Sequence, residues 1–383
     1  MTYWAQHGYG KSDKLQVVAD HGLLTGVVLS PADEDQASLQ ATGAQLQAQG
    51  SQILMDPQLY VHTIRGGVAR CHESHGLEFG ELSWFMAPSD IEAQVRSVRE
   101  ANVEVGTPAV IAPSPYQATF GDVWTPISLQ YGRAMLEETD QPVYLSLIAE
   151  DAAFADWDQT QAYLDALTTL DAAGVYLVVG HSGRTYPFTW EADRLANVLR
   201  VIHILTEYNR YDLVWGYADL AGLAGLAAGA SGAATGWYHS LRMWSPGKWI
   251  PQTGGRQANP RLFVRNLLSP LDSAGEAVSV ARTSVADQVF SDDGLRDHFR
   301  QDLAWGIADS WIQHMTSIAE LFSELDIDTQ ASDRVATVIG LVTEALELLG
   351  NAEAAGAALS PSHRSRLESL RAGLRLFAEA EGL

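Results

Sequence analysis

Two carboxylates and two imidazoles follow short apolar runs of this sequence, at points where strands are expected to end. They are Asp56, Glu150, His181 and His239. Carboxyl and imidazole side chains are common general acids and bases in enzymes, because their pKa values can be brought near neutrality. At the carboxyl ends of parallel strands, such groups would share one face of the fold. We therefore interpret these four residues as candidate catalytic groups.

The local sequence leaves a structural role open for both carboxylates. Pro57 biases the backbone of Asp56 towards an extended conformation, which would project the carboxylate at the rim of a sheet. A carboxylate at this point could equally cap a turn. Glu150 precedes Asp151, so it could equally be an acid at the start of a helix.

A second group of residues would contact a substrate at the same face. Ser114, Tyr217 and Trp237 each follow an apolar run. Arg184 closes the turn that begins at Gly180, where backbone N–H groups and the guanidinium could approach an anion. These residues are predicted to bind substrate rather than to transfer protons.

One window of this acidic chain is basic. No Asp or Glu occurs between Leu220 and Leu271, although the whole protein has a formal charge of -23. Tryptophans alternate there with cations, as a site for an anionic, base-bearing ligand would require. A surface that is locally basic for no functional reason is the alternative. The cations predicted to hold phosphate are Arg242, Lys248 and Arg256, and Arg261 and Arg265 lie in the same window.

A metal site is not expected. Cys71, His72, Glu73 and His75 are close in sequence, but neighbouring side chains of a loop rarely converge on one ion. Cys71 is the only cysteine, which excludes a multi-cysteine zinc site and an intrachain disulfide. We expect no metal and no other cofactor.

The elements that would position these residues alternate between strands and helices. This rhythm is typical of βα units around a parallel sheet and predicts an α/β fold of the (β/α)8 TIM-barrel type. The barrel domain would occupy residues 1–275, with an inserted loop at about 58–86. The expected strands are Leu24–Leu29, Gln52–Met55, Ala109–Ala112, Val143–Ile148, Val175–Val179, Leu213–Trp215 and Ala233–Thr235, with Leu262–Val264 as a candidate eighth.

A helical region is predicted to follow the barrel over residues 276–383. Apolar residues recur every three or four positions from Leu295 to Phe322, which predicts one long amphipathic helix. Two further helices are expected at about Ser332–Leu349 and Pro361–Ala380. These helices could pack on the barrel or form a homodimer interface.

The composition of the chain limits which cellular compartment and which binding partners we expect. The chain has 46% hydrophobic and 19% charged residues, which is ordinary for a soluble globular protein. Its N-terminus shows no apolar signal segment, and its most apolar run, Leu220–Gly236, is too interrupted by Ala and Gly to span a bilayer. We expect a cytoplasmic protein without a membrane partner. A nucleic acid could meet it only at the basic window of residues 237–265.

Several segments together resemble the barrel of the tRNA-guanine transglycosylase superfamily. Gln52–Tyr60 resembles the family strand that ends in an active-site aspartate, here Asp56, and Val143–Glu150 is similar to the strand that ends in a base-recognising Gln-Gly pair. The longest similarity runs from Leu213 to Arg242. The resemblance implies exchange of a guanine for a deazaguanine in a nucleic acid. It also implies contact between the basic segment and the nucleic acid.

The chain departs from the family pattern in two ways. The segment Ala233–Tyr238 contains no carboxylate where the nucleophilic aspartate should lie, and the family's cysteine-rich zinc site cannot form with one cysteine. Asp56 or Glu150 would have to replace the nucleophile, or the protein would bind without exchanging bases.

Three functions therefore remain open from the sequence. The first is a divergent transglycosylase-like barrel that binds a purine- or deazaguanine-type base, free or in a nucleic acid. The second is a barrel lyase or hydrolase that acts on a small anionic metabolite. The third is a non-catalytic subunit whose barrel and helices serve assembly.

Overall fold

Eight parallel strands form one continuous sheet in the computed structural model, which describes residues 2–77, 79, 87–183, 185–251 and 259–383. The strand order is β3-β2-β1-β8-β7-β6-β5-β4, and the two end strands contact each other, so the sheet curls into a nearly closed barrel. The strands are β1 (Tyr3–Gln6), β2 (Gly26–Leu29), β3 (Gln52–Met55), β4 (Val110–Ile111), β5 (Val143–Glu150), β6 (Gly174–Gly180), β7 (Asp212–Gly216) and β8 (Gly232–Thr235).

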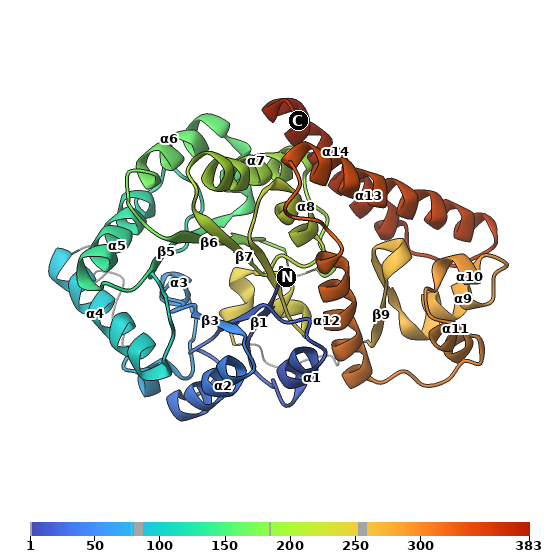
Figure 1. The fold of residues 1–383 in the computed structure, drawn as a ribbon, viewed down its shortest axis with the longest axis horizontal. Helices are drawn as coiled ribbons and strands as arrows, with labels where there is room; N and C mark the ends of the chain where they lie inside the picture. The colour runs from blue at the N-terminus through green and yellow to red at the C-terminus, as the bar shows by residue number, and fades with distance from the viewer. Residues whose placement is uncertain (1, 78, 80–86, 184, 252–258) are drawn as a thin grey trace.

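Helices connect the strands and cover the outside of the barrel (Figure 1). Their spacing between the strands is that of a (β/α)8 fold, as the sequence predicts. These helices are α1 (Lys14–Asp20), α2 (Gln36–Ala48), α3 (Tyr60–Thr63), α4 (Pro88–Val105), α5 (Trp124–Glu138), α6 (Trp157–Leu167), α7 (Ala192–His203) and α8 (Ala221–Ala228).

The eighth strand of the barrel is not the one that the sequence analysis favours. Leu262–Val264 falls in β9 (Arg261–Val264), which pairs with β10 (Ser269–Asp272) in an antiparallel hairpin outside the barrel sheet. The missing strand is β1, which pairs with both β2 and β8. β1 has only four residues, beginning with the bulky pair Tyr3 and Trp4, and so short a segment was not recognised as a strand from the sequence.

The long helix predicted from Leu295 to Phe322 is two helices. They are α11 (Asp293–Arg300) and α12 (Ile307–Ser323). Asp302 adopts a left-handed φ of 56°, and Gly306 caps α12 by donating its N–H to Asp309 Oδ2. The apolar spacing continues across this break, which is why periodicity alone could not reveal it.

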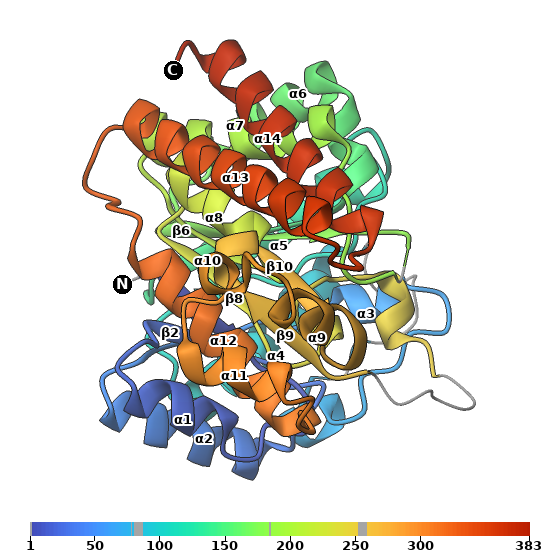
Figure 2. The ribbon, with the colours of Figure 1, turned by 90° about the vertical axis from the view of Figure 1, so that its right-hand side faces the viewer.

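The C-terminal helices α12, α13 (Ala331–Ala354) and α14 (Pro361–Glu381) lie along one side of the barrel (Figure 2). Helix α13 packs against α8 and α14, and α14 packs against α7. The length and composition of α13 would allow it to cross a membrane, but its buried side chains belong to the core shared with the barrel. This packing accounts for part of its apolar composition.

A second, smaller hydrophobic cluster lies beyond α12. The hairpin β9–β10, the short helices α9 (Val278–Ala281) and α10 (Ala286–Val289), and α11 contribute to it. Leu349 and Ala352 of α13 complete this cluster, so α13 joins both cores. Figure 1 shows this small unit beside the barrel, with α12 between them.

Candidate functional site

Asp56 lies at the carboxyl end of β3 and is almost completely buried, with 1% of its surface exposed. Its Oδ2 accepts a hydrogen bond of 2.6 Å from the Tyr60 hydroxyl, and its Oδ1 accepts one of 3.0 Å from the Gln58 N–H. Burial raises the pKa of Asp56 to about 6, although both hydrogen bonds oppose the rise. A carboxyl group with this pKa can exchange protons near neutral pH.

Side chains from three other strands of the barrel surround Asp56. The pKa values of Tyr176, on β6, and of Tyr217, after β7, are raised first by burial and then by the negative charge of Asp56. Tyr176 also donates a hydrogen bond of 3.3 Å to Oε1 of Gln6 on β1. These groups meet at the carboxyl ends of the strands, which we call the barrel mouth. Gln6, Asp56, Tyr60, Tyr176 and Tyr217 form the Asp56 cluster.

Lys248 brings a positive charge to the Asp56 cluster. Its Nζ lies 3.4 Å from the Tyr217 hydroxyl, 4.9 Å from the centre of the Tyr217 ring and 4.3 Å from the centre of the Trp249 ring. Burial lowers the pKa of Lys248, while the charges of Asp33 and Asp56 oppose that shift. An ammonium group between aromatic rings and carboxylates can hold the anionic form of a ligand or of Asp56 itself.

An aromatic wall, formed by Trp244 and Tyr116, lies beside the Asp56 cluster. Trp244 packs edge-on against Tyr60, with ring centres 5.4 Å apart, and at a tilt against Tyr116, at 4.8 Å. Position 180 must be glycine for this approach, because a Cβ there would lie 2.6 Å from Cζ3 of Trp244. The Trp244 carbonyl also accepts a 3.0 Å hydrogen bond from the His181 N–H, which ties this wall to the end of β6.

Several buried polar atoms near the mouth have no hydrogen-bond partner within the part of the chain that the structure describes. Gln58 illustrates the arrangement: its Oε1 accepts hydrogen bonds from the Ser30 hydroxyl and the Ala32 N–H, but its Nε2 is unpaired. Gln117, beside the end of β5, has neither amide atom paired. Buried polar groups are rarely left unpaired, so this concentration is unusual for a protein interior. The atoms concerned are Gln6 Nε2, Gln58 Nε2, Gln117 Nε2 and Oε1, the Tyr116 hydroxyl, and Nε1 of Trp244 and Trp249.

Glu150 and His181 lie next to each other on β5 and β6, because Glu150 is in register with Gly180. Burial raises the pKa of Glu150 to about 7, and the charge of Asp151 adds to the rise. His181 Nδ1 lies 3.9 Å from Asp151 Oδ2, but burial keeps the pKa of His181 below its usual value. The His181 ring stacks on Phe188 with 3.7 Å between ring centres. Glu150 and His181 thus form a second pair of titratable side chains at the barrel mouth.

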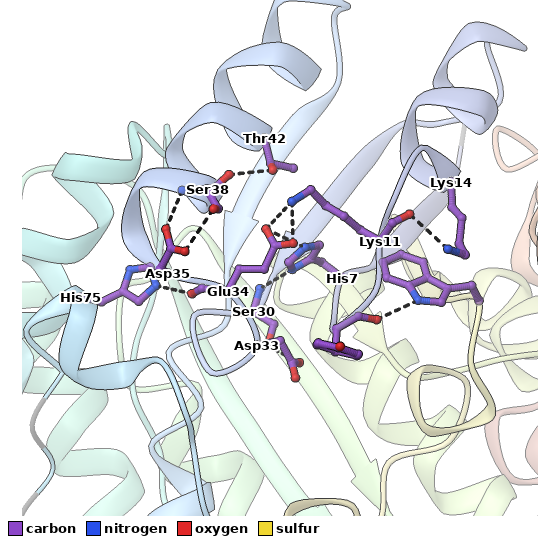
Figure 3. Close-up of polar contacts among 12 residues, drawn as sticks. His7, Lys11, Lys14, Ser30, Asp33, Glu34, Asp35, Ser38, Thr42 and His75 are labelled. Atoms are coloured by element: carbon purple, nitrogen blue, oxygen red, sulfur yellow. Dashed lines mark hydrogen bonds and ion pairs between the residues drawn. The ribbon is translucent and has the colours of Figure 1, made fainter. Parts of the chain in front are cut away.

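A third polar network lies after β1 and β2 (Figure 3). His7 accepts a 3.2 Å hydrogen bond from the Ser30 N–H at Nδ1, and its Nε2 lies 3.5 Å from Glu34 Oε2. Glu34 also pairs with Lys11, at 2.5 Å. The Ser30 hydroxyl oxygen also lies 2.9 Å from Asp33 Oδ2, so the network reaches the carboxylate whose charge acts on Lys248. It orders the two loops beside the Asp56 cluster.

The structure places the remaining predicted residues away from the Asp56 cluster or in supporting roles. The Ser114 hydroxyl donates to the carbonyl of Pro115, and the fully buried Trp237 donates Nε1–H to the Tyr9 carbonyl. His239 is exposed and lies near Tyr186, with 6.2 Å between ring centres. Arg184 and Arg256 lie outside the described residues.

The cations of the basic window do not form an open surface in the described part of the chain. Arg242 is buried and donates to the carbonyls of Gly236 and Trp237. Arg265 is paired with Glu324, and Arg261 donates to the carbonyl of Pro270. The window is therefore largely an interior segment, and only Lys248 among these cations joins the Asp56 cluster.

The histidines of the 71–75 segment point to different partners. His72 is bonded to His62 at 2.9 Å, while His75 bonds to the Glu34 carbonyl at 2.8 Å. Among the described residues, no group of three or more His, Cys, Asp and Glu is arranged to hold a metal ion.

The sequence predicts functional roles for Asp56, Tyr217 and Lys248, and the structure places these residues together. Gln6, Tyr60, Tyr176 and Gln117 were not predicted. The first was missed with β1, and Tyr176 looked like an ordinary strand residue. Tyr60, four residues after Asp56, could have been found as a helix-spaced neighbour of the carboxylate.

Comparison with known proteins does not assign this chain to a family. No protein-family model matches the chain, and no curated protein matches it. A solved structure described as that of a candidate copper homeostasis protein, CutC from Streptococcus agalactiae, covers 61% of this chain and 98% of its own. Its sequence is 14% identical and its TM-score is 0.37. From its own geometry, the chain is a (β/α)8 barrel with an additional C-terminal helical region.

Proposed function

We propose that the barrel mouth binds a flat, nitrogen-rich heterocycle of the purine or deazaguanine type and exchanges a proton with it through Asp56. The observation that carries this proposal is the buried Asp56 carboxyl, whose pKa is raised to about 6 inside a ring of tyrosines. Such a group can hydrogen-bond to the N–H edge of a base as a carboxylate or protonate a ring nitrogen as an acid.

The side chains around Asp56 are suited to both the flat faces and the polar edge of such a heterocycle. The half-buried ring of Tyr116, which packs against the buried Trp244, offers a face for stacking. The unpaired amides of Gln58 and Gln117 offer donors and an acceptor for the polar edge of a heterocycle. A purely apolar metabolite would leave these amides unpaired, at a cost of about 1–3 kcal/mol for each group.

The charges favour a free ligand over a nucleic acid. Binding a phosphate backbone requires several accessible cations, and the described arginines of the basic window are bonded to carbonyls or carboxylates. The formal charge of -23 would also repel a polyanion. The superfamily resemblance thus supports base recognition more strongly than nucleic-acid binding.

The proposal is tested by calorimetric titration with free purines, deazaguanine and their nucleosides at pH 7.5. We expect at least one to bind the wild type, and Asp56→Asn to weaken that binding by roughly tenfold or more, because a charge-assisted hydrogen bond contributes about 1.5–3 kcal/mol. Glu379→Gln, an exposed carboxylate on α14, is the matched control and should bind like the wild type.

Two results would contradict the proposal. One is that no compound of the panel binds the wild type. The other is that folded Asp56→Asn binds as tightly as Glu379→Gln. Salt-sensitive binding of an oligonucleotide, absent for every free base, would instead assign the site to nucleic acid.

A further inference from the structure

A small cavity opens beside the barrel mouth, between the ends of β6 and β7 and helix α14. Its volume is about 60 Å³, enough for a group of a few heavy atoms. Two arginines from distant parts of the chain line it: Arg242, after β8, and Arg366, on α14. Its other polar lining comes from His181, Tyr186, Tyr217 and Asp219, and aromatic lining comes from Phe188, Trp190 and Trp215.

Both arginines are buried and held in fixed orientations. Arg242 is 6% exposed and Arg366 is 9% exposed. Arg366 donates from Nε to the Ser362 carbonyl and from Nη2 to the Ser269 hydroxyl, and its Nη2 lies 3.0 Å from His363 Nδ1. A guanidinium has five N–H donors, and the contacts of the described residues engage those on Nε and Nη2 in both arginines. Arg366 therefore retains donors on Nη1, while Arg242 also hydrogen-bonds to the Tyr186 side chain.

The charges around the cavity leave a surplus of positive charge. Asp219 is the carboxylate in its wall, and it already accepts hydrogen bonds from the Tyr186 hydroxyl at 2.9 Å and lies 3.0 Å from His314 Nε2. Burial, with the nearby charge of Arg242, lowers the pKa of His314 to about 4, so this histidine is neutral near pH 7. The carboxylate of Glu276 and the guanidinium of Arg261 also act on Arg366, so two carboxylates face three guanidinium groups. A buried, unbalanced cation is costly unless an anion joins it.

The backbone of the wall is strained. Tyr217 and Asp219 adopt left-handed φ values of 57° and 45°, which cost non-glycine residues free energy. Tyr217 belongs to the Asp56 cluster and also lines this cavity, so the two sites share this side chain. A ligand held by both sites would therefore pass its connecting atoms along Tyr217.

We propose that this cavity binds an oxyanion, phosphate or carboxylate, with Arg242 and Arg366 as its cationic partners. In the substrate, this oxyanion is joined to the heterocycle that Asp56 recognises; that link rests on the proposed function, whereas binding of the oxyanion itself does not. The C-terminal region consequently completes the site, because Arg366 belongs to α14. Fork-shaped guanidinium groups bind such oxygens through paired hydrogen bonds.

The test measures the stabilisation of the protein by inorganic phosphate and by acetate, each against chloride at equal ionic strength. A ligand that binds only the folded state raises its melting temperature in a concentration-dependent way. We expect at least one of the two anions to stabilise the wild type and Arg375→Gln, an exposed arginine of the same helix. Arg366→Gln should weaken that apparent affinity tenfold or more, and Arg366→Lys should weaken it less.

A second variant covers the case in which Arg366→Gln does not fold. Leu370→Phe enlarges a side chain of the cavity wall and leaves both arginines in place, so it should also abolish the stabilisation. The proposal is overturned if neither anion stabilises the wild type beyond chloride. It is equally overturned if folded Arg366→Gln or Leu370→Phe responds like Arg375→Gln.

Asp56→Asn separates this inference from the proposed function. It should respond to the anion as the wild type does, even if no heterocycle binds to either protein. If heterocycles do bind, a nucleoside monophosphate should bind the wild type about tenfold more tightly than its nucleoside. Arg366→Gln should lose that preference, and an unchanged preference would refute the link between the two sites.

Discussion

At the scale of single residues, the site depends on carboxyl groups placed where water cannot stabilise their charge. Asp56 and Glu150 both have raised pKa values, chiefly because each is removed from solvent. Neither is held by an ion pair within 4 Å in the described residues. Raised values of this kind are typical of groups that transfer protons, and they also impose a cost on folding above neutral pH.

This cost predicts how stability depends on pH. The folded-state pKa of Asp56, about 6, is higher than its ordinary value of 3.8. The folded state therefore binds the proton more tightly, and stability is lost as pH rises through about 4 to 6. The shift corresponds to about 3 kcal/mol. Urea unfolding from pH 4 to 8 should show wild type losing about this much relative to Asp56→Asn.

Glu379→Gln is the control for that series, because the carboxylate it replaces is exposed. Its unfolding free energy should run parallel to that of the wild type at every pH. Parallel curves for wild type and Asp56→Asn would show that Asp56 titrates normally and would remove the physical basis of its proposed role.

Residue types and their order in the chain revealed part of this site. Asp56 was predictable because an apolar run ends at it, and Lys248 because it stands in a segment without carboxylates. The direction in which a side chain points was not predictable. Arg242 was expected to meet phosphate at a surface, whereas its guanidinium is turned inward onto two carbonyls. The amides of Gln6 and Gln117 acquire significance only because the barrel brings them together.

At the scale of elements, close packing depends on where glycine occurs in helices. On α8, a Cβ at Gly222 would lie 2.7 Å from Ala233 Cβ and 2.8 Å from Phe322 Cζ. This helix therefore sits close to β8 and α12. On α13, a Cβ at Gly340 would meet no atom within 4 Å.

Two alanine substitutions should consequently change stability in opposite directions. Gly222→Ala should destabilise the protein by about 1–3 kcal/mol, because the added methyl group overpacks the core. Gly340→Ala should stabilise it by up to about 1 kcal/mol, because alanine favours the helix. Chemical denaturation of both variants measures the difference. Equal stabilisation by both would mean that α8 does not pack as closely as described.

Helices α13 and α14 were easier to predict than the strands of the barrel. Amphipathic helices repeat their apolar positions over many residues, so the starts of α13 and α14 were located from sequence to within one residue. Strands of two to five residues carry much less signal. β1 was missed for this reason, and β9 was mistaken for a barrel strand because both kinds of strand are short and apolar.

At the scale of the whole molecule, negative charge must lower the stability of the compact state. With a formal charge of -23, like charges are brought closer together on folding. Dissolved salt shortens the range of this repulsion from about 10 Å at 0.1 M to about 3 Å at 1 M. We expect the melting temperature at pH 7.5 to rise from 20 mM to 1 M potassium chloride.

The same titration at pH 5 provides the control, because the charge is much smaller near the sequence pI of about 4.7. The increase in melting temperature with salt should therefore be smaller at pH 5. A melting temperature that changes equally with salt at both pH values would point to a general effect of salt on hydrophobic burial instead of relief of repulsion.

The position of β1 has a consequence for the order in which the chain can fold. This strand lies between β2, which follows it closely, and β8, which ends at Thr235. During synthesis, β8 emerges only after more than half of the chain has been made. Until then, one edge of β1 has no strand to pair with. Contacts between such distant segments slow folding, because a long loop must close before they form. Docking of β8 is thus the event that joins the two halves of the sheet, and it occurs late.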